Sequence, residues 1–204
     1  MLPNRTFIPT KRIASATLAF MLVAAMAFGL GNIADAKTKV RKQQPQPEIG
    51  AIELAQRIHV LINKERARYR LTALTWDDAL ADVATKHSRD MAQRDYFAHV
   101  SPDGSDFAER YRRSRYHCEI RVDNTIYGGA ENLALGRLYN KATIIDGVKY
   151  PKWNTMEQIA RNTVDGWMHS AGHRHNILNP HWRQEGIGIV ILPENKVLVT
   201  QNFC

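Results

Sequence analysis

Apolar side chains recur every three or four positions in four stretches of the chain, the spacing of an amphipathic helix. The first stretch runs from Ile52 to about Arg68, and the second follows a possible N-cap at Thr75. The third spans about 106–115 and the fourth about 156–170. The pattern therefore predicts four helices, with turns between them.

Two later segments show the alternation of a β-hairpin instead. GIGIVIL and KVLVTQNF flank the Pro-Glu-Asn turn at 193–195, and residues 138–155 alternate around Asp146-Gly147. The predicted helices come mainly in the first part of the chain and a predicted hairpin comes last. We therefore predict an α+β fold, built as a helix–sheet–helix sandwich.

The amino terminus has the pattern of a secretory signal peptide. Three basic residues precede an apolar run at 13–30, and Ala34-Asp35-Ala36 offers a small-x-small cleavage site. We therefore predict a signal peptide at 1–36 and a protein that is secreted, periplasmic or on the exterior of the cell envelope. An uncleaved membrane anchor is the alternative, because the run is nearly long enough to span a bilayer.

The rest of the chain divides into a spacer and one domain. Residues 37–50 are basic and then rich in Gln and Pro, which predicts a solvated linker, and 51–204 can bury a single core. The 204-residue chain has a net charge of +8. Removing 1–36, with three basic residues and one acid, leaves +6, a charge that attracts anionic surfaces.

Cys118 and Cys204 are the two cysteines of the chain. In an exported protein they suggest one disulfide, whereas free thiols or an intermolecular bridge are the alternatives. The sequence alone does not place the two Cα atoms within bonding distance.

Histidines and one glutamate mark the candidate chemistry. His99 precedes the SPDG turn, Glu131 follows a glycine pair, and His173 lies in WMHSAGHRHNIL. Imidazole and carboxylate suit zinc or another divalent cation, and they also suit general acid–base catalysis. The chain has no HExxH motif, and Gly172 is expected to end the fourth helix, which argues against a zincin-type protease.

The other chemical patterns favour structural roles. His87 lies on an apolar helix face and is expected to be a hydrogen-bonded core residue. His59, His117 and His181 have no carboxylate pattern around them and are expected at the surface or in packing. The basic segment ERYRRSRYHCEIR, at 109–121, is typical of a solvated helix face, and no nucleic-acid partner is expected for an exported protein.

Four ordered motifs together resemble a known family. HSRDMAQRDYFAHVSPDG, AENLALG, WMHSAGHRHNILNP and GIGIVI…VTQNFC resemble the SCP-like, bacterial branch of the CAP superfamily (cysteine-rich secretory, antigen 5 and pathogenesis-related proteins). The resemblance covers about Ile52 to Cys204. It implies a three-layer α-β-α sandwich with a central cleft.

The resemblance also implies a site. In many members two histidines and two glutamates hold a divalent metal; His99, Glu131 and His173 match three of these four residues, and Ser170 stands where the second glutamate would fall. This departure puts metal affinity in doubt. The 138–155 stretch is longer than the connection usual in bacterial members, and we expect it to influence ligand choice unless it is an inert elaboration.

Three functions remain open at this point. The first is a binding protein for a lipid, sterol or cell-envelope glycan, with His99, Glu131, Ser170 and His173 around the ligand. The second is a hydrolase in which His99 and His173 hold a metal and Glu131 activates water as the catalytic base. The third is an exported scaffold whose site residues only hold the cleft together.

Overall fold

The computed structural model describes residues 42–204, which form one compact unit. The predicted signal peptide at 1–36 and the start of the predicted linker lie outside the described residues. Within the part of the chain that the structure describes, the hydrophobic core is built from residues 49–204, all of which a chain that begins at Lys37 retains.

A four-stranded sheet in the order β1-β7-β8-β4 forms the middle of the unit. The predicted terminal hairpin is confirmed, and its strands β7 and β8 occupy the centre of the sheet. β4 pairs antiparallel with β8, whereas β1 pairs parallel with β7. The four strands are β1 (Thr75–Trp76), β4 (Ala130–Arg137), β7 (Gln184–Ile191) and β8 (Lys196–Phe203).

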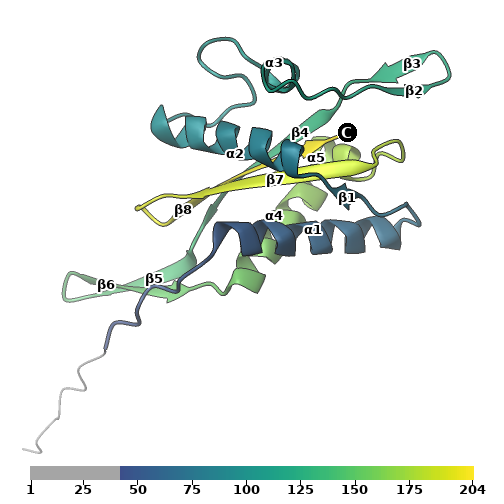
Figure 1. The fold of residues 1–204 in the computed structure, drawn as a ribbon. Helices are drawn as coiled ribbons and strands as arrows, with labels where there is room; N and C mark the ends of the chain where they lie inside the picture. Colours follow the sequence, from purple (N-terminus) through teal and green to yellow (C-terminus); the bar gives the residue numbers. More distant parts are fainter. Residues whose placement is uncertain (1–41) are drawn as a thin grey trace, which may run out of the picture. The chain divides into compact units, whose positions relative to one another are not determined.

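Helices cover both faces of this sheet, as predicted for a three-layer α-β-α sandwich (Figure 1). α2 packs on β7 and β8 from one side, while α1 and α4 pack together on the other side, where α4 and α5 also meet β4. The helices are α1 (Ala51–Arg68), α2 (Asp78–Gln93), α4 (Met156–His169) and α5 (Ala171–Ile177).

The start of α2 differs from the expected one. Asp77, not Thr75, is the N-cap, and its carboxylate accepts the Leu80 N–H at 2.8 Å. Thr75 instead belongs to β1, where its N–H donates to Arg183 O at 2.9 Å. The prediction of Thr75 as the N-cap was therefore wrong, because pairing with β7 extends Thr75 and Trp76 and the helix begins after them.

The end of α4 also differs. The helix stops at Ser170, which has extended backbone angles, and Gly172 lies inside the short α5 that follows. The prediction that Gly172 ends the helix was therefore wrong by two residues.

Three smaller elements stand outside the sandwich. α3 (Phe107–Arg113) leads to the short hairpin of β2 (Ile120–Val122) and β3 (Thr125–Tyr127). The predicted hairpin at 138–155 is present as β5 (Tyr139–Ile145) and β6 (Val148–Trp153). Asp146 and Gly147 form its two-residue turn with φ of 50° and 75°, which suits the twist of a tight hairpin.

Cys118 and Cys204 form a disulfide, with Cα atoms 5.6 Å apart. The bond joins the chain after α3 to the end of β8. Within residues 42–204, no helix is long and apolar enough to cross a membrane.

Candidate functional site

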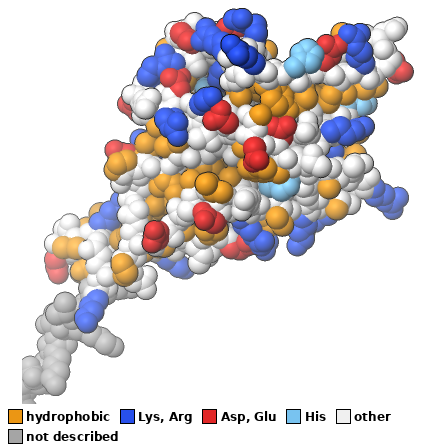
Figure 2. All heavy atoms as spheres, viewed as in Figure 1, with side chains coloured by type: hydrophobic (Ala, Val, Ile, Leu, Met, Phe, Trp, Pro, Cys, Tyr) orange, Lys and Arg blue, Asp and Glu red, His pale blue; other side chains and the backbone are white. Residues whose placement is uncertain are grey.

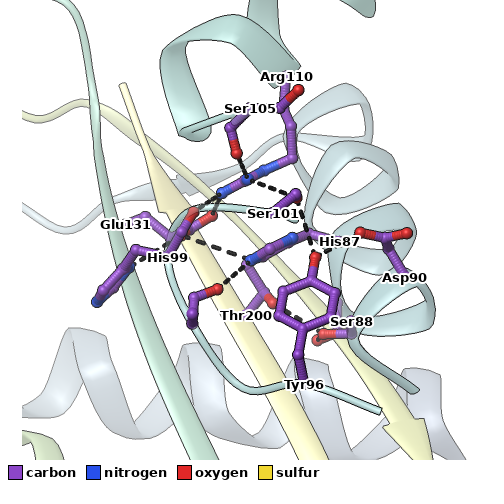
Figure 3. Close-up of polar contacts among 12 residues, drawn as sticks. His87, Ser88, Asp90, Tyr96, His99, Ser101, Ser105, Arg110, Glu131 and Thr200 are labelled. Atoms are coloured by element: carbon purple, nitrogen blue, oxygen red, sulfur yellow. Dashed lines mark hydrogen bonds and ion pairs between the residues drawn. The ribbon is translucent and has the colours of Figure 1, made fainter. Parts of the chain in front are cut away.

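The structure brings His99 and Glu131 together, as the sequence motifs suggested. His99 lies in the loop after α2, and its Nδ1 is 3.0 Å from Oε1 of Glu131 at the start of β4 (Figure 3). The Glu131 side chain is 1% exposed. A carboxylate so completely removed from water needs a charged or hydrogen-bonding partner.

Arg110 of α3 is that partner, and sequence reasoning missed it. Its Nη2 donates to the second carboxylate oxygen of Glu131, Oε2, at 2.7 Å. The same guanidinium donates to His99 O at 3.0 Å and to Ser105 O at 2.8 Å (Figure 3). Arg110 therefore compensates the buried charge and fixes the loop that carries His99.

His87 closes the inner side of this cluster. Its ring is buried, as expected for a core histidine, and Nε2 lies 3.1 Å from Ala98 O and 3.9 Å from Glu131 Oε1. A carbonyl only accepts, so Nε2 must carry a proton. Burial lowers the pKa of His87, and the Glu131 charge opposes this effect without outweighing it. The ring is therefore neutral at pH 7.

Two serines that lie near histidines in the sequence have structural partners. Ser88 Oγ donates to Gly188 O at 2.9 Å and lies 2.8 Å from Thr200 Oγ1. Ser101 Oγ lies 2.9 Å from the hydroxyl of Tyr96, which also contacts the Asp90 carboxylate. Neither serine contacts a histidine in these bonds, so the arrangement does not resemble a nucleophile–base pair.

On the face of the sheet that α1 and α4 cover, a row of buried polar side chains links α5 to α1. Asn132 donates to His173 O at 3.3 Å and to Gln201 Oε1 at 3.0 Å. Gln201 in turn donates to Glu185, whose other oxygen lies 2.6 Å from His59 Nδ1. The sequence shows no carboxylate near His59 because Glu185 is 126 residues away.

Ser170 and His173 lie at a groove between α4 and the outer edge of β4. The groove has a volume of about 440 Å³. Burial, followed by the nearby charge of His99, lowers the pKa of His173, so this imidazole favours its neutral form. The groove is lined by Leu133, Ala134, Leu135, Gly136, Arg137, Tyr139, Asn140, Asn154, Ile159, Asn162, Thr163, Gly166, Trp167, Ser170 and His173.

The donor set does not fit a divalent metal. Both oxygens of Glu131 are engaged, one by His99 and one by the cationic Arg110, and Ser170 supplies no carboxylate. A guanidinium bound to the only glutamate of the set repels a cation placed there. Among residues 42–204, no group of three or more His, Cys, Asp or Glu is arranged to hold a metal ion.

Together these features define a three-layer α+β domain with a buried Arg–Glu–His cluster and a groove beside it. The model of the cysteine-rich secretory protein family, CAP, matches residues 60–203. The chain belongs to this family, as its motifs suggested.

Relatives with known sequences or structures agree with this assignment. The chain is 32% identical over 143 residues to the uncharacterized membrane protein YlbC of Bacillus subtilis, covering 70% of this chain and 32% of that protein. An extracellular protein containing an SCP domain from Bacillus anthracis is 28% identical, with a TM-score of 0.53 over 75% of this chain and 40% of that one.

An outer surface protein of Borrelia burgdorferi shares the fold at 18% identity, with a TM-score of 0.56 over 78% of this chain and 97% of that one. The chain thus spans less than half the length of the two Bacillus relatives, whereas it matches nearly the whole of the Borrelia protein.

Proposed function

We propose that the chain is an exported binding protein that holds an amphiphilic molecule, a lipid or a sterol, in the groove between α4 and β4. The observation that carries the proposal is the groove itself, which joins an apolar wall to the polar Ser170 and His173. The volume of about 440 Å³ falls in the range of small-molecule sites, which are mostly apolar with a few placed polar groups.

Apolar and polar side chains both line the groove. Leu135, half exposed on β4, offers apolar contact, with the almost fully buried Ile159 and Trp167 of α4 beside it. The Ser170 hydroxyl and the neutral His173 imidazole can donate to or accept from a hydroxyl or carboxyl head group.

Export is part of the same proposal. The apolar run at 13–30, the cleavage pattern ending at Ala36 and the disulfide between Cys118 and Cys204 all suit an oxidising, extracytoplasmic environment. The B. anthracis relative is described as extracellular, which supports the same location.

Gly166 gives a direct test. It lines the groove on α4, and a Cβ placed there would meet no atom within 4 Å. Gly166→Phe therefore has room at its Cβ and places a ring beside the groove, and we expect it to weaken binding of a fluorescent fatty acid or sterol at least about tenfold. Titration of residues 37–204 by fluorescence measures the effect.

Gly166→Ala is the matched control, because a single methyl group leaves most of the groove open. Both variants should be as stable as the parent or slightly more so, since glycine is unfavourable inside a helix. Equal affinity in all three proteins would contradict the groove as the binding site. If the parent binds soluble glycans instead of lipids and Gly166→Phe abolishes that binding, the groove remains the binding site but the ligand class is a glycan.

A further inference from the structure

The tip of the β5–β6 hairpin exposes aliphatic side chains to solvent. Ile144 is 72% exposed, Ile145 39% and Val148 46%. Ile145 pairs with Val148 and Ile144 with Lys149, so the two pairs lie on opposite faces of the hairpin. Because both faces of the tip carry aliphatic groups, packing of one face on the domain does not account for them.

Basic and aromatic residues follow the aliphatic tip toward the base of the hairpin. Lys149 lies next to the tip, and Lys141 and Lys152 pair further down. At the base, Tyr139 and Trp153 have ring centroids 5.9 Å apart. Asp146 is the one acid within residues 139–153, so the hairpin carries a net positive charge.

This order matches the layers of a membrane surface. Aliphatic groups suit the acyl region, whereas lysines and amphipathic aromatic rings favour the head-group level of an anionic bilayer. Figure 1 shows the hairpin extending away from the helices and the central sheet, so that among residues 42–204 no other element covers its tip. At this end of the domain, Figure 2 shows hydrophobic side chains together with basic and acidic ones.

The described chain begins beside the same hairpin. Gln43 Nε2 donates to Lys149 O at 3.0 Å, and Trp153 Nε1 donates to Gln44 O at 3.0 Å. In the sequence, residues 37–42 (KTKVRK) supply four more basic residues and no acid immediately before these contacts. The described chain therefore begins next to the hairpin, and in the sequence a basic segment precedes it.

We propose that the β5–β6 hairpin inserts its tip into the surface of a bilayer rich in anionic phospholipid and holds the domain there. The charge of the hairpin favours this partner over a second copy of the chain, because two lysine-bearing tips repel each other. The proposal concerns the hairpin and does not depend on ligand binding in the groove.

Co-sedimentation of residues 37–204 with vesicles tests it. We compare vesicles of phosphatidylglycerol and phosphatidylcholine with vesicles of phosphatidylcholine alone. The protein should bind the anionic vesicles, and 1 M salt should weaken binding because it screens the lysines. The double variant Ile144→Ser/Val148→Ser should lower the partition coefficient about tenfold or more, since it removes two aliphatic side chains that would enter the acyl region of the bilayer.

Ile126→Ser is the matched control, because Ile126 is 57% exposed on the other hairpin. It should bind like the parent, and so should Gly166→Phe, which separates this surface from the groove. Failure of the parent to bind anionic vesicles would overturn the proposal, as would equal binding by the double variant. A dimer in sedimentation velocity that the double variant abolishes would overturn it too and assign the tip to a second copy instead.

Discussion

At the scale of single residues, Arg110 is the feature that most changes the interpretation of the site. It pairs with the fully buried Glu131 and shares that carboxylate with His99. Removing one partner of a buried ion pair leaves an uncompensated charge, which costs more than the pair itself contributes. The cluster is therefore sensitive to loss of Arg110 in a way that exposed ion pairs are not.

We predict that Arg110→Met lowers the free energy of unfolding by about 3–5 kcal/mol. Arg113→Met, three residues away, should have a much smaller effect, because Arg113 pairs with Glu109 and Asp103 at the surface, where water screens the charges. Urea unfolding measures both. Adding Glu131→Gln to Arg110→Met should recover part of the lost free energy of unfolding. If Arg110→Met and Arg113→Met lower the free energy of unfolding by similar amounts, the role assigned to Arg110 is contradicted.

The sequence located His99, Glu131, Ser170 and His173 through their motifs but not Arg110. Arg110 belongs to a run of similar arginines, and composition does not distinguish the buried one from Arg112 and Arg113. The helical positions of α3 do distinguish it from the other arginines. Arg110 lies three residues after Phe107 and next to Tyr111, so it borders the inward face of α3.

At the scale of elements, the two glycines of the GIGIVIL segment in β7 have a packing role. A Cβ at Gly188 would lie 2.0 Å from the Thr85 backbone nitrogen in α2, and a Cβ at Gly186 would lie 2.1 Å from that of Ala81. The two glycines let α2 approach the sheet closely. The backbone atoms of a helix cannot move aside as the end of a flexible side chain can, so Gly186 and Gly188 cannot be replaced by a larger residue without a shift of α2.

We expect Gly188→Ala to lower the free energy of unfolding by about 3 kcal/mol, the upper end for an overpacked core. Gly136→Ala on β4 is the matched control. Its Cβ would meet Val197 Cβ at 3.7 Å, an ordinary contact, and alanine suits a strand better than glycine. Thermal unfolding compares the two, and an equal shift in Tm would show that α2 adjusts to the added methyl group.

Several elements could be predicted from their sequence patterns. α1, α2 and α4 each bury one face, and the β7–β8 hairpin, which is buried on both faces, shows two apolar runs around a turn. The elements that the sequence analysis did not predict include β4 (Ala130–Arg137), an edge strand of the central sheet, and two shorter segments. β1 (Thr75–Trp76) exists through its pairing with β7, more than a hundred residues later, and α5 begins because Ser170 breaks the helix without a glycine or proline. The strand β1 therefore depends on a tertiary contact and the helix α5 on the backbone conformation of one residue, and local propensity predicts neither.

At the scale of the whole molecule, the disulfide joins two parts of the domain that otherwise meet through a small apolar cluster. Cys204 packs with Leu80, Val83 and Tyr111, and its backbone pairs with Gln184, the first residue of β7. The bond closes a loop with a sequence separation of 86. A loop of this length restricts the unfolded chain strongly, so the bond stabilises chiefly by raising the free energy of the unfolded state.

The chain-entropy account sets an upper estimate of about 4–5 kcal/mol for this contribution. We therefore expect Cys118→Ala/Cys204→Ala to lower the free energy of unfolding by up to that amount, measured in urea. Dithiothreitol should lower the free energy of unfolding of the parent by a comparable amount and leave that of the double variant unchanged. This comparison separates the effect of the covalent bond from the effect of losing the packing of two sulfur atoms. The native sheet should survive, because the backbone pairing of Cys204 with Gln184 does not involve the thiol. A double variant that is unfolded in water would instead show that the apolar cluster around Tyr111 cannot hold α3 and the end of β8 together without the bond.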